Sequence, residues 1–235
     1  MSKTSYWRLQ HFRVCVVILV GLVIYAGSTH SSLYAADPQP KILILGDSLS
    51  AAYGLEQHQG WVSLLRQRLI DQGYAYTVIN AAISGETTQG GLTRLPQLLK
   101  EHQPEIVLIE LGGNDGLRGQ PIPNTKANLA QMIELAQASG AQVVLGGMMI
   151  PPNYGPRYTQ MFSQMYPDLG EEHNVAVIPF ILQGIADQPN LMQADQIHPT
   201  AQAQPMLLDN IWPVLMPLLN KDRSQALSTP LIHAA

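Results

Sequence analysis

The amino-acid sequence predicts a three-layer α/β/α domain built on a doubly wound, five-stranded parallel sheet. Two observations support this fold class. The 235 residues are 46% apolar and only 13% charged, which is enough apolar material for one sizeable core. Five short apolar runs alternate with longer stretches of helical spacing, the order expected when helices cover both faces of a sheet.

The five expected strands are short and rich in valine and isoleucine. Continuous apolar runs are typical of parallel strands buried on both faces, whereas half-exposed strands alternate apolar and polar residues. The runs are Lys41–Leu45, Tyr76–Asn80, Ile106–Leu111, Gln142–Met148 and Val175–Pro179.

The stretches between the strands carry apolar residues at helical spacing. We expect Gly73 to end the first helix, Pro96 to lie early in the second, and Pro213 to break or kink the last. The expected helical stretches are Trp61–Leu69, Leu92–Leu99, Asn128–Ala138, Tyr158–His173 and Ala201–Leu219.

The two ends of the chain differ in composition from the part between them. Residues 1–36 start with a basic segment, continue with an apolar run of about 13 residues and end in small and polar residues. A helix that spans a bilayer needs about 20 apolar residues, so we expect a signal peptide rather than an uncleaved anchor. We therefore expect a folded domain over 37–220, a flexible tail over 221–235, and export to the periplasm or beyond.

Charge and cysteine content exclude several classes of function. Residues 1–36 hold three basic and no acidic residues, so the formal charge changes from -4 for the chain to -7 for the remainder. An acidic surface disfavours nucleic acids, and we expect no stable membrane insertion once the signal peptide is removed. Cys15 is the only cysteine, and its place in the signal peptide excludes thiol nucleophiles and thiolate metal ligands from the mature domain. We expect that domain to be a monomer.

Polar motifs follow the first three expected strands. Ser48 comes just after the first, Gly85 lies in the loop after the second, and Asn114 follows the third. In open parallel sheets, binding sites form beyond the carboxyl ends of the strands, so these residues would gather at one edge. Each motif by itself is equally typical of an ordinary polar turn.

Asp195 and His198 supply the remaining groups of the predicted site. An aspartate three residues before a histidine can accept a hydrogen bond from Nδ1–H when the loop curls, which leaves Nε2 to face a serine. Such a pair is common on protein surfaces, so it indicates a catalytic site only in combination with Ser48 and Asn114. A hydroxyl, a base with its orienting acid, and oxyanion donors are the groups that acyl transfer requires.

Taken together, these motifs resemble the four sequence blocks of the SGNH (GDSL-type) hydrolases, in the same order. Other segments are similar to one branch of that family, the multifunctional bacterial thioesterase I, lysophospholipase L1 and arylesterase group. The resemblance covers roughly residues 41–218. The four blocks are Gly46–Ser50, Asn80–Gly85, Gly112–Asp115 and Asp195–His198, and the branch-specific segments are Arg94–Pro96, Leu111–Gly119, Pro151–Gly155 and Ala203–Pro205.

The resemblance implies a flavodoxin-like SGNH hydrolase fold and a serine esterase that needs neither a cofactor nor a metal. It makes Ser48 the nucleophile, His198 the general base and then acid, and Asp195 the residue that orients the histidine. The oxyanion hole would be formed by the backbone N–H groups of Ser48 and Gly85 with the side chain of Asn114. The implied substrates are small esters or thioesters with an acyl chain, namely aryl esters, acyl-CoA thioesters and lysophospholipids.

Apolar residues near the motifs are candidates for an acyl groove. These are Leu117, Ile150 and Ile197, although packing in the core is the ordinary role of such residues. The sequence departs from the family pattern at residues 54–60, which form a slightly longer segment, and at Met149, where related proteins often carry arginine. Both departures bear on substrate preference and not on the reaction.

Two other classes of protein share parts of this pattern. A metal-dependent phosphoesterase also uses Gly-Asp and Gly-Asn-Asp loops, but it needs several converging ligands, and His198 is the only histidine expected near a strand end. Sensitivity to chelators would indicate this class. A flavodoxin-like binding module would share the sheet order, but Asp47 would repel a phosphate. A yellow purified protein would indicate that module.

Overall fold

The structure, a computed structural model, describes residues 39–220. The expected signal peptide over 1–36 and the expected tail over 221–235 lie outside the described residues. Among the helices formed by residues 39–220, none combines the length and the apolar character needed to cross a membrane.

Five strands form one parallel sheet, which confirms the predicted fold class. The strands are β1 (Lys41–Gly46), β2 (Thr77–Asn80), β3 (Ile106–Glu110), β4 (Gln142–Gly146) and β5 (Ala176–Ile178). Their order in the sheet is β2-β1-β3-β4-β5, so the chain adds a strand on one side of β1 and then builds outward on the other. Because all strands run in one direction, their carboxyl ends share one edge, where Gly46 is in register with Glu110.

The two central strands are completely buried where their apolar runs lie. Residues 42–45 of β1 and 106–109 of β3 each expose 0% of their surface. Burying one such side chain stabilises a fold by about 1.5–3 kcal/mol, which explains why uninterrupted apolar runs mark these strands in the sequence. The observed strand bounds agree with the predicted ones to within two residues.

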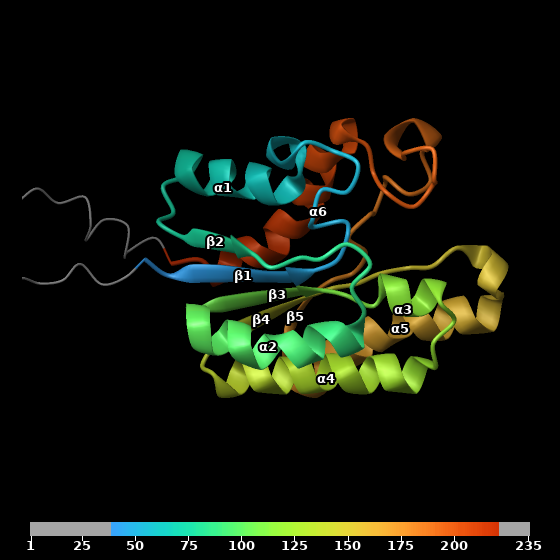
Figure 1. Ribbon diagram of the computed structural model, residues 1–235, viewed down its shortest axis with the longest axis horizontal. Coiled ribbons are helices and arrows are strands. Elements are labelled where there is room, and N and C mark those ends of the chain that lie inside the picture. The colour runs from blue at the N-terminus through green and yellow to red at the C-terminus, as the bar shows by residue number, and fades with distance from the viewer. Residues whose placement is uncertain (1–38, 221–235) are drawn as a thin grey trace, which may run out of the picture. The chain divides into compact units, whose positions relative to one another are not determined.

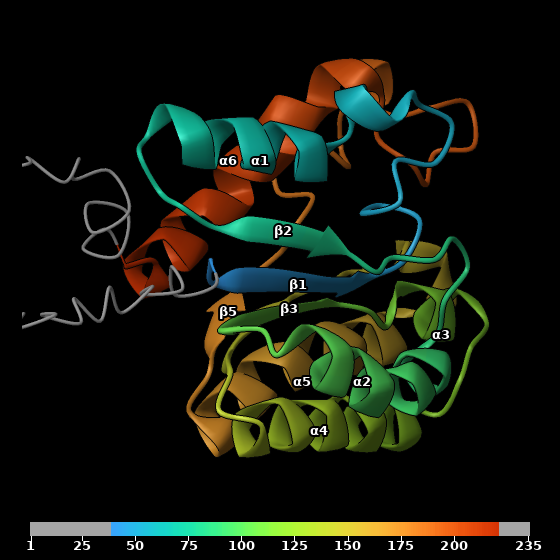
Figure 2. The same ribbon diagram turned by 60° about the vertical axis from the view of Figure 1, so that its left-hand side comes forward.

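Helices cover both faces of the sheet. Figures 1 and 2 show α1 and α6 on one face, and α2, α4 and α5 on the other, with α3 close to the carboxyl edge. Neighbours within a layer contact each other, α1 with α6, and α4 with both α2 and α5. The helices are α1 (Trp61–Asp71), α2 (Thr88–His102), α3 (Gly113–Leu117), α4 (Ile122–Ala138), α5 (Pro156–His173) and α6 (Gln204–Leu215). Short 3-10 turns lie at Gln57–Gln59, Pro152–Tyr154, Pro189–Leu191, Ala201–Ala203 and Met216–Leu218.

Helix α2 begins four residues before the expected stretch. The Thr87 side chain caps it by accepting a hydrogen bond from the Gly90 N–H, and helical structure starts at Thr88. The prediction started at Leu92 because glycines at the beginning of the helix disfavour helical structure. As a result, Pro96 lies inside the helix and not near its start, which corrects the prediction.

Three further helical segments differ from the predicted ones. Helix α4 begins at Ile122 instead of Asn128, because Pro123 lies in its first turn, where a proline loses no hydrogen bond. The segment after β3 forms the short helix α3 where a turn was expected. The stretch 201–219 is divided into a 3-10 turn, α6 and a second 3-10 turn, and α6 continues through Pro213 to its end.

Candidate active site

The segment after β1 turns at the carboxyl edge of the sheet and carries Ser48. Gly46 allows a close approach there, because a Cβ at this position would lie 2.7 Å from Glu110 Oε2. The next residue, Asp47, is buried, and its carboxyl group accepts a hydrogen bond from the Leu49 N–H at 3.1 Å. Ser48 itself is half-buried at the edge of the sheet, where the prediction placed it.

The loop that carries His198 is shaped by hydrogen bonds to one carboxylate. Asp195 Oδ1 accepts from the backbone N–H groups of Ile197 and His198, both at 3.0 Å. Gln196, which links Asp195 to these two residues, takes a left-handed backbone conformation with a φ of 57°. Asp195 Oδ2 lies 2.7 Å from His198 Nδ1. An ionised carboxylate can only accept, so this contact assigns the histidine proton to Nδ1.

Ser48 and His198 are in direct contact although they lie 150 residues apart in the chain. His198 Nε2 is 2.8 Å from Ser48 Oγ, and with Nδ1 protonated it accepts the serine hydroxyl hydrogen. Burial acts to raise the pKa of Asp195, but hydrogen bonds from the His198 side chain and from the His198 and Ile197 backbone outweigh it and lower the pKa to about 2. Asp195 is therefore ionised at neutral pH.

Tyr53, which the sequence analysis did not single out, packs against the His198 ring. The two ring centroids are 4.4 Å apart and the planes are inclined by 36°. Positive φ angles at Ala52 and Gly54 turn the chain on either side of the tyrosine. Gln193 Nε2 donates to the Tyr53 carbonyl at 2.9 Å, which links this turn to the loop that carries His198. A contact between two loops leaves no periodic signal in the sequence.

Asn114 and Gly85 lie in the segments that follow the two strands flanking β1. Asn114 Nδ2 donates to Asp47 Oδ2 at 3.0 Å, which leaves its second amide hydrogen free for another acceptor. Gly85 has a φ of 80°, a conformation that favours glycine, and its carbonyl accepts from Arg118 Nη2 at 3.1 Å. The backbone at Gly85 is thus held in a shape that a larger residue would adopt only with strain.

A pocket of about 510 Å³ opens around Ser48 and His198, and we call it the active-site pocket. Asn114 lines it, whereas Gly85 does not. The three predicted groove residues Leu117, Ile150 and Ile197 also line it. Met149, noted above as a departure from the family pattern, lines it too, as do apolar residues that were not predicted, namely Met148, Phe180, Ile181, Leu182, Ala186 and Met192. Most of the residues that line the pocket are therefore apolar.

The acidic groups beside Ser48 include one that was not predicted. Glu110 lies at the end of β3 behind the serine turn and is fully buried. The sequence signal for it was an acid inside the otherwise apolar run 106–111, which the strand prediction passed over. Within residues 39–220, no group of three or more His, Cys, Asp or Glu side chains is placed to hold a metal ion.

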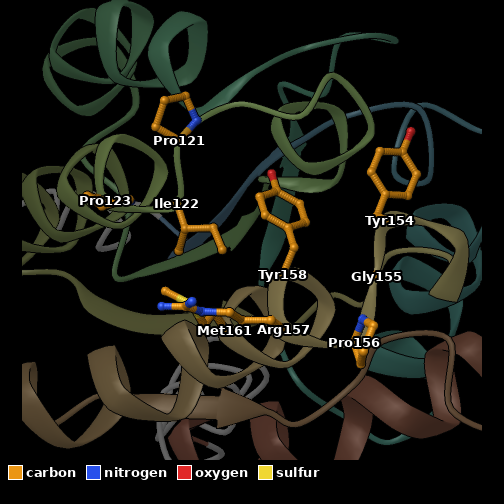
Figure 3. A pocket seen from close by; sticks show the side chains of 9 residues that line it. All are labelled: Pro121, Ile122, Pro123, Tyr154, Gly155, Pro156, Arg157, Tyr158 and Met161. Carbon is orange, nitrogen blue, oxygen red and sulfur yellow. The ribbon is translucent and has the colours of Figure 1, made fainter.

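A second hollow, of about 550 Å³, lies between the start of α4 and the start of α5 (Figure 3). The hydroxyls of Tyr154 and Tyr158 donate to the carbonyls of Leu117 and Gln120, at 2.6 and 2.7 Å. Its lining residues are Pro121, Ile122, Pro123, Tyr154, Gly155, Pro156, Arg157, Tyr158 and Met161. It shares no lining residue with the active-site pocket, and its lining combines no hydroxyl with a base, so the reactive groups belong to the active-site pocket.

Comparison with known proteins identifies the family. Residues 44–204 match the GDSL-like lipase/acylhydrolase family. The chain is 54% identical over 178 residues to esterase TesA of Pseudomonas aeruginosa, covering 76% of this chain and 89% of that protein. It is 48% identical over 175 residues to an arylesterase of Vibrio mimicus, covering 74% and 88%. It is 45% identical over 181 residues to thioesterase 1/protease 1/lysophospholipase L1 of Escherichia coli K12, covering 77% and 86%.

Solved structures agree with the sequence comparison. The crystal structure of the psychrotrophic esterase EstA from Pseudoalteromonas, inhibited by monoethylphosphonate, is similar with a TM-score of 0.73 and 44% identity. The similarity covers 76% of this chain and 98% of that one. The predicted resemblance is thereby confirmed in both sequence and fold, and the chain belongs to the GDSL-like lipase/acylhydrolase family.

Proposed function

We propose that this protein is a serine hydrolase that cleaves carboxylic esters and thioesters through an acyl-enzyme on Ser48. One observation carries the proposal. A continuous hydrogen-bonded series runs from Asp195 through His198 to Ser48, with distances of 2.7 and 2.8 Å, and ends in a mostly apolar pocket. A hydroxyl that contacts a base, itself held by an acid, is the arrangement that activates serine as a nucleophile.

The proposed reaction uses these three side chains in two steps. Ser48 Oγ attacks the carbonyl carbon while His198 Nε2 takes its proton, and His198 then gives that proton to the departing alcohol or thiol. A water molecule attacks the acyl-enzyme with His198 again acting as base, which releases the acid and restores Ser48. Asp195 stays ionised, keeps the proton on Nδ1 and stabilises the imidazolium that forms in each step.

We assign the oxyanion hole to the backbone N–H groups of Ser48 and Gly85 and to the side chain of Asn114. The free amide hydrogen of Asn114 and its position in the active-site pocket support this role. The positive φ of Gly85 and its missing side chain support a close approach of substrate to its N–H. Removing one such donor typically lowers kcat by about 10²–10³.

The apolar wall supports substrates with an uncharged acyl chain. Leu117, Ile150 and Ile197 would contact that chain, and within residues 39–220 the pocket lining includes no lysine or arginine. Met149, which is 53% exposed, adds a further apolar side chain to the pocket. The names of the relatives support three substrate classes, namely aryl esters, acyl thioesters and lysophospholipids.

We also propose that the protein is exported to the periplasm or beyond and acts there as a monomer. The basic, apolar and small-residue segments of residues 1–36 support cleavage of a signal peptide. N-terminal sequencing of the exported protein tests the cleavage, since an intact residue 1 would contradict it. Light scattering during gel filtration tests the oligomeric state.

The substitution Ser48→Ala tests the proposed reaction. Hydrolysis of p-nitrophenyl acetate and butyrate should be lost while the melting temperature stays near that of the wild type, because only one half-buried oxygen is removed. Ser163→Ala in α5 is the matched control and should keep full activity. A panel of acyl-CoA and lysophospholipid substrates, run with the same proteins, defines the leaving group. Retained activity in pure Ser48→Ala protein would rule out the proposal.

A further inference from the structure

Glu110 is a buried acid directly behind the turn that carries Ser48. Its Oε2 accepts hydrogen bonds from the Asp47 N–H at 3.2 Å and from the Ser50 hydroxyl at 2.6 Å. Its other oxygen, Oε1, is buried, and no donor within residues 39–220 reaches it. An ionised carboxylate with 0% exposure would need donors on both oxygens or a cation beside it.

Glu110 lies next to a second buried acid. Asp47 is only 3% exposed and accepts hydrogen bonds from the Leu49 N–H and from Asn114 Nδ2. Two acids this close in a buried site cannot both ionise at neutral pH, because like charges repel strongly where water is excluded. A single proton shared between the two acids would remove this repulsion.

Several observations place that proton on Glu110. Burial and then the negative charge of Asp47 raise the pKa of Glu110 well above its usual range, whereas burial raises the pKa of Asp47 only to about 6. The interaction between the two acid side chains raises the pKa of Glu110 and lowers that of Asp47, so a proton shared between them favours Glu110. Asp47 also has two donors of its own to stabilise a negative charge.

We propose that Glu110 is a neutral carboxylic acid in the working enzyme and acts as a positioning residue, donating to the ionised Asp47, which in turn holds Asn114 and the Ser48 turn. Glu110 thereby supports both the turn that carries the nucleophile and the amide of the oxyanion hole, without contacting the substrate. It accepts from the turn at Asp47 and Ser50, and through Asp47 it orients the amide that would bind the oxyanion. The expected effect of Glu110 on the rate depends on the serine hydrolase function proposed above, whereas its protonation state does not.

The other titratable groups around the acid pair fit this assignment. His198 interacts electrostatically with Asp47 from its loop and lowers the pKa of that acid. The Tyr166 phenol on α5 is fully buried, and burial followed by the nearby acids, Asp115 first, raises its pKa well above the ordinary value. Tyr166 is therefore a neutral phenol at pH 7, and a phenol has no cationic form that could stabilise an ionised Glu110.

Two substitutions separate a neutral acid from an ionised one. Glu110→Gln keeps an acceptor for the Asp47 N–H and Ser50 hydroxyl and places an N–H donor where the acid proton lies. Its kcat for p-nitrophenyl butyrate should stay within about threefold of the wild type. Glu110→Met fills a similar volume without polar atoms and leaves these partners unpaired, so kcat should fall by at least about tenfold with a smaller change in KM.

Infrared spectroscopy measures the protonation directly. At pH 7 the wild type should show the stretch of a buried protonated carboxyl group, and Glu110→Gln should lack it. Absence of this band from the wild type, or a Glu110→Gln variant as impaired as Glu110→Met, would overturn the inference. If Glu110→Met fails to fold, the band and the Glu110→Gln kinetics still decide. The band reports the protonation of Glu110 whether or not Ser48→Ala keeps its activity. Failure of the proposed function can therefore be told apart from failure of this inference.

Discussion

Asp195, which contacts His198, and Glu110, which contacts the turn that carries Ser48, have opposite environments. Asp195 lies in a loop, its side chain is 37% exposed, and three hydrogen bonds from His198 and Ile197 lower its pKa to about 2. Glu110 ends a central strand, is fully buried, has one oxygen without a donor, and its pKa is raised. The difference shows that hydrogen-bond donors and burial, and not the type of acid, determine the charge.

Each charge state matches what its side of the proposed site requires. The histidine needs an ionised acid, because a negative charge at Nδ1 stabilises the imidazolium that forms during the reaction. The turn that carries Ser48 needs a neutral acid behind it. A second negative charge would repel the ionised Asp47 strongly in this buried site. The same substitution, acid to amide, should therefore have very different consequences at the two positions.

The largest expected effect is that of Asp195→Asn. An asparagine can donate to Nδ1 and so favour the wrong tautomer, in which Nε2 carries the proton and cannot accept the serine hydroxyl hydrogen. We expect kcat to fall by roughly 10³–10⁴, as is typical when the orienting acid of such a site becomes an amide. Glu110→Gln, assayed in parallel with p-nitrophenyl butyrate, should stay near the wild type. Equal losses in the two variants would remove the distinction between the acids.

The next effect concerns the amide that Asp47 holds. Asn114→Ala should lower kcat by about 10²–10³ with a smaller change in KM, because the donor acts mainly on the charge of the transition state. Asn124→Ala, at an exposed position in α4, is the control. The double variant with Glu110→Met should lose less than the product of the two single losses, since part of the effect of Glu110 acts through Asn114. Fully additive losses would show that Glu110 does not act through Asn114.

Stability should depend on pH in opposite directions for the two acids. The folded pKa of Asp195 is below its ordinary value of 3.8, so its contribution is present above pH 4 and is lost as the pH falls toward 2. The folded pKa of Glu110 is above its ordinary value of 4.5, so the wild type loses stability relative to Glu110→Gln as the pH rises from there. Denaturant midpoints of both variants and the wild type, from pH 3 to 9, measure this. Parallel curves for the wild type and Glu110→Gln would contradict the neutral acid.

The smallest expected effect is that of the aromatic ring beside His198. Contacts between aromatic rings contribute about 0.5–1.5 kcal/mol, so loss of the ring that positions His198 in Tyr53→Leu should lower kcat by roughly two- to tenfold. Tyr53→Phe keeps the ring and should resemble the wild type. If the two variants lose equal activity, the hydroxyl and not the ring is what matters at this position.

Much of the fold was predictable because its signals are local. Burial on both faces makes the strands continuous apolar runs, and these matched the structure closely. The starts of α2 and α4 were missed because glycine and proline suggest a turn, whereas a threonine cap and a first-turn proline in fact begin these helices. Helix α3 is too short to show a periodicity.

The residues of the candidate site also divide into those that have a local signal in the sequence and those that do not. Ser48, Asn114 and His198 could be nominated because strand ends and a spacing of three residues are visible in the chain. Tyr53 could not, since its contact joins two irregular loops far apart in the sequence. The only sequence signal for Glu110 was an acid within an apolar run. Its role depends on its burial and on its contact with Asp47, which are features of the tertiary structure.

The most direct test of the account is to trap the nucleophile. Diethyl p-nitrophenyl phosphate reacts with an activated serine, releases p-nitrophenolate and leaves a stable phosphoryl group that peptide mass spectrometry can locate. We expect a single adduct on Ser48, none in Ser48→Ala, and much slower labelling in His198→Ala. An adduct on another residue, or labelling of His198→Ala at the rate of the wild type, would contradict the claim that His198 activates Ser48.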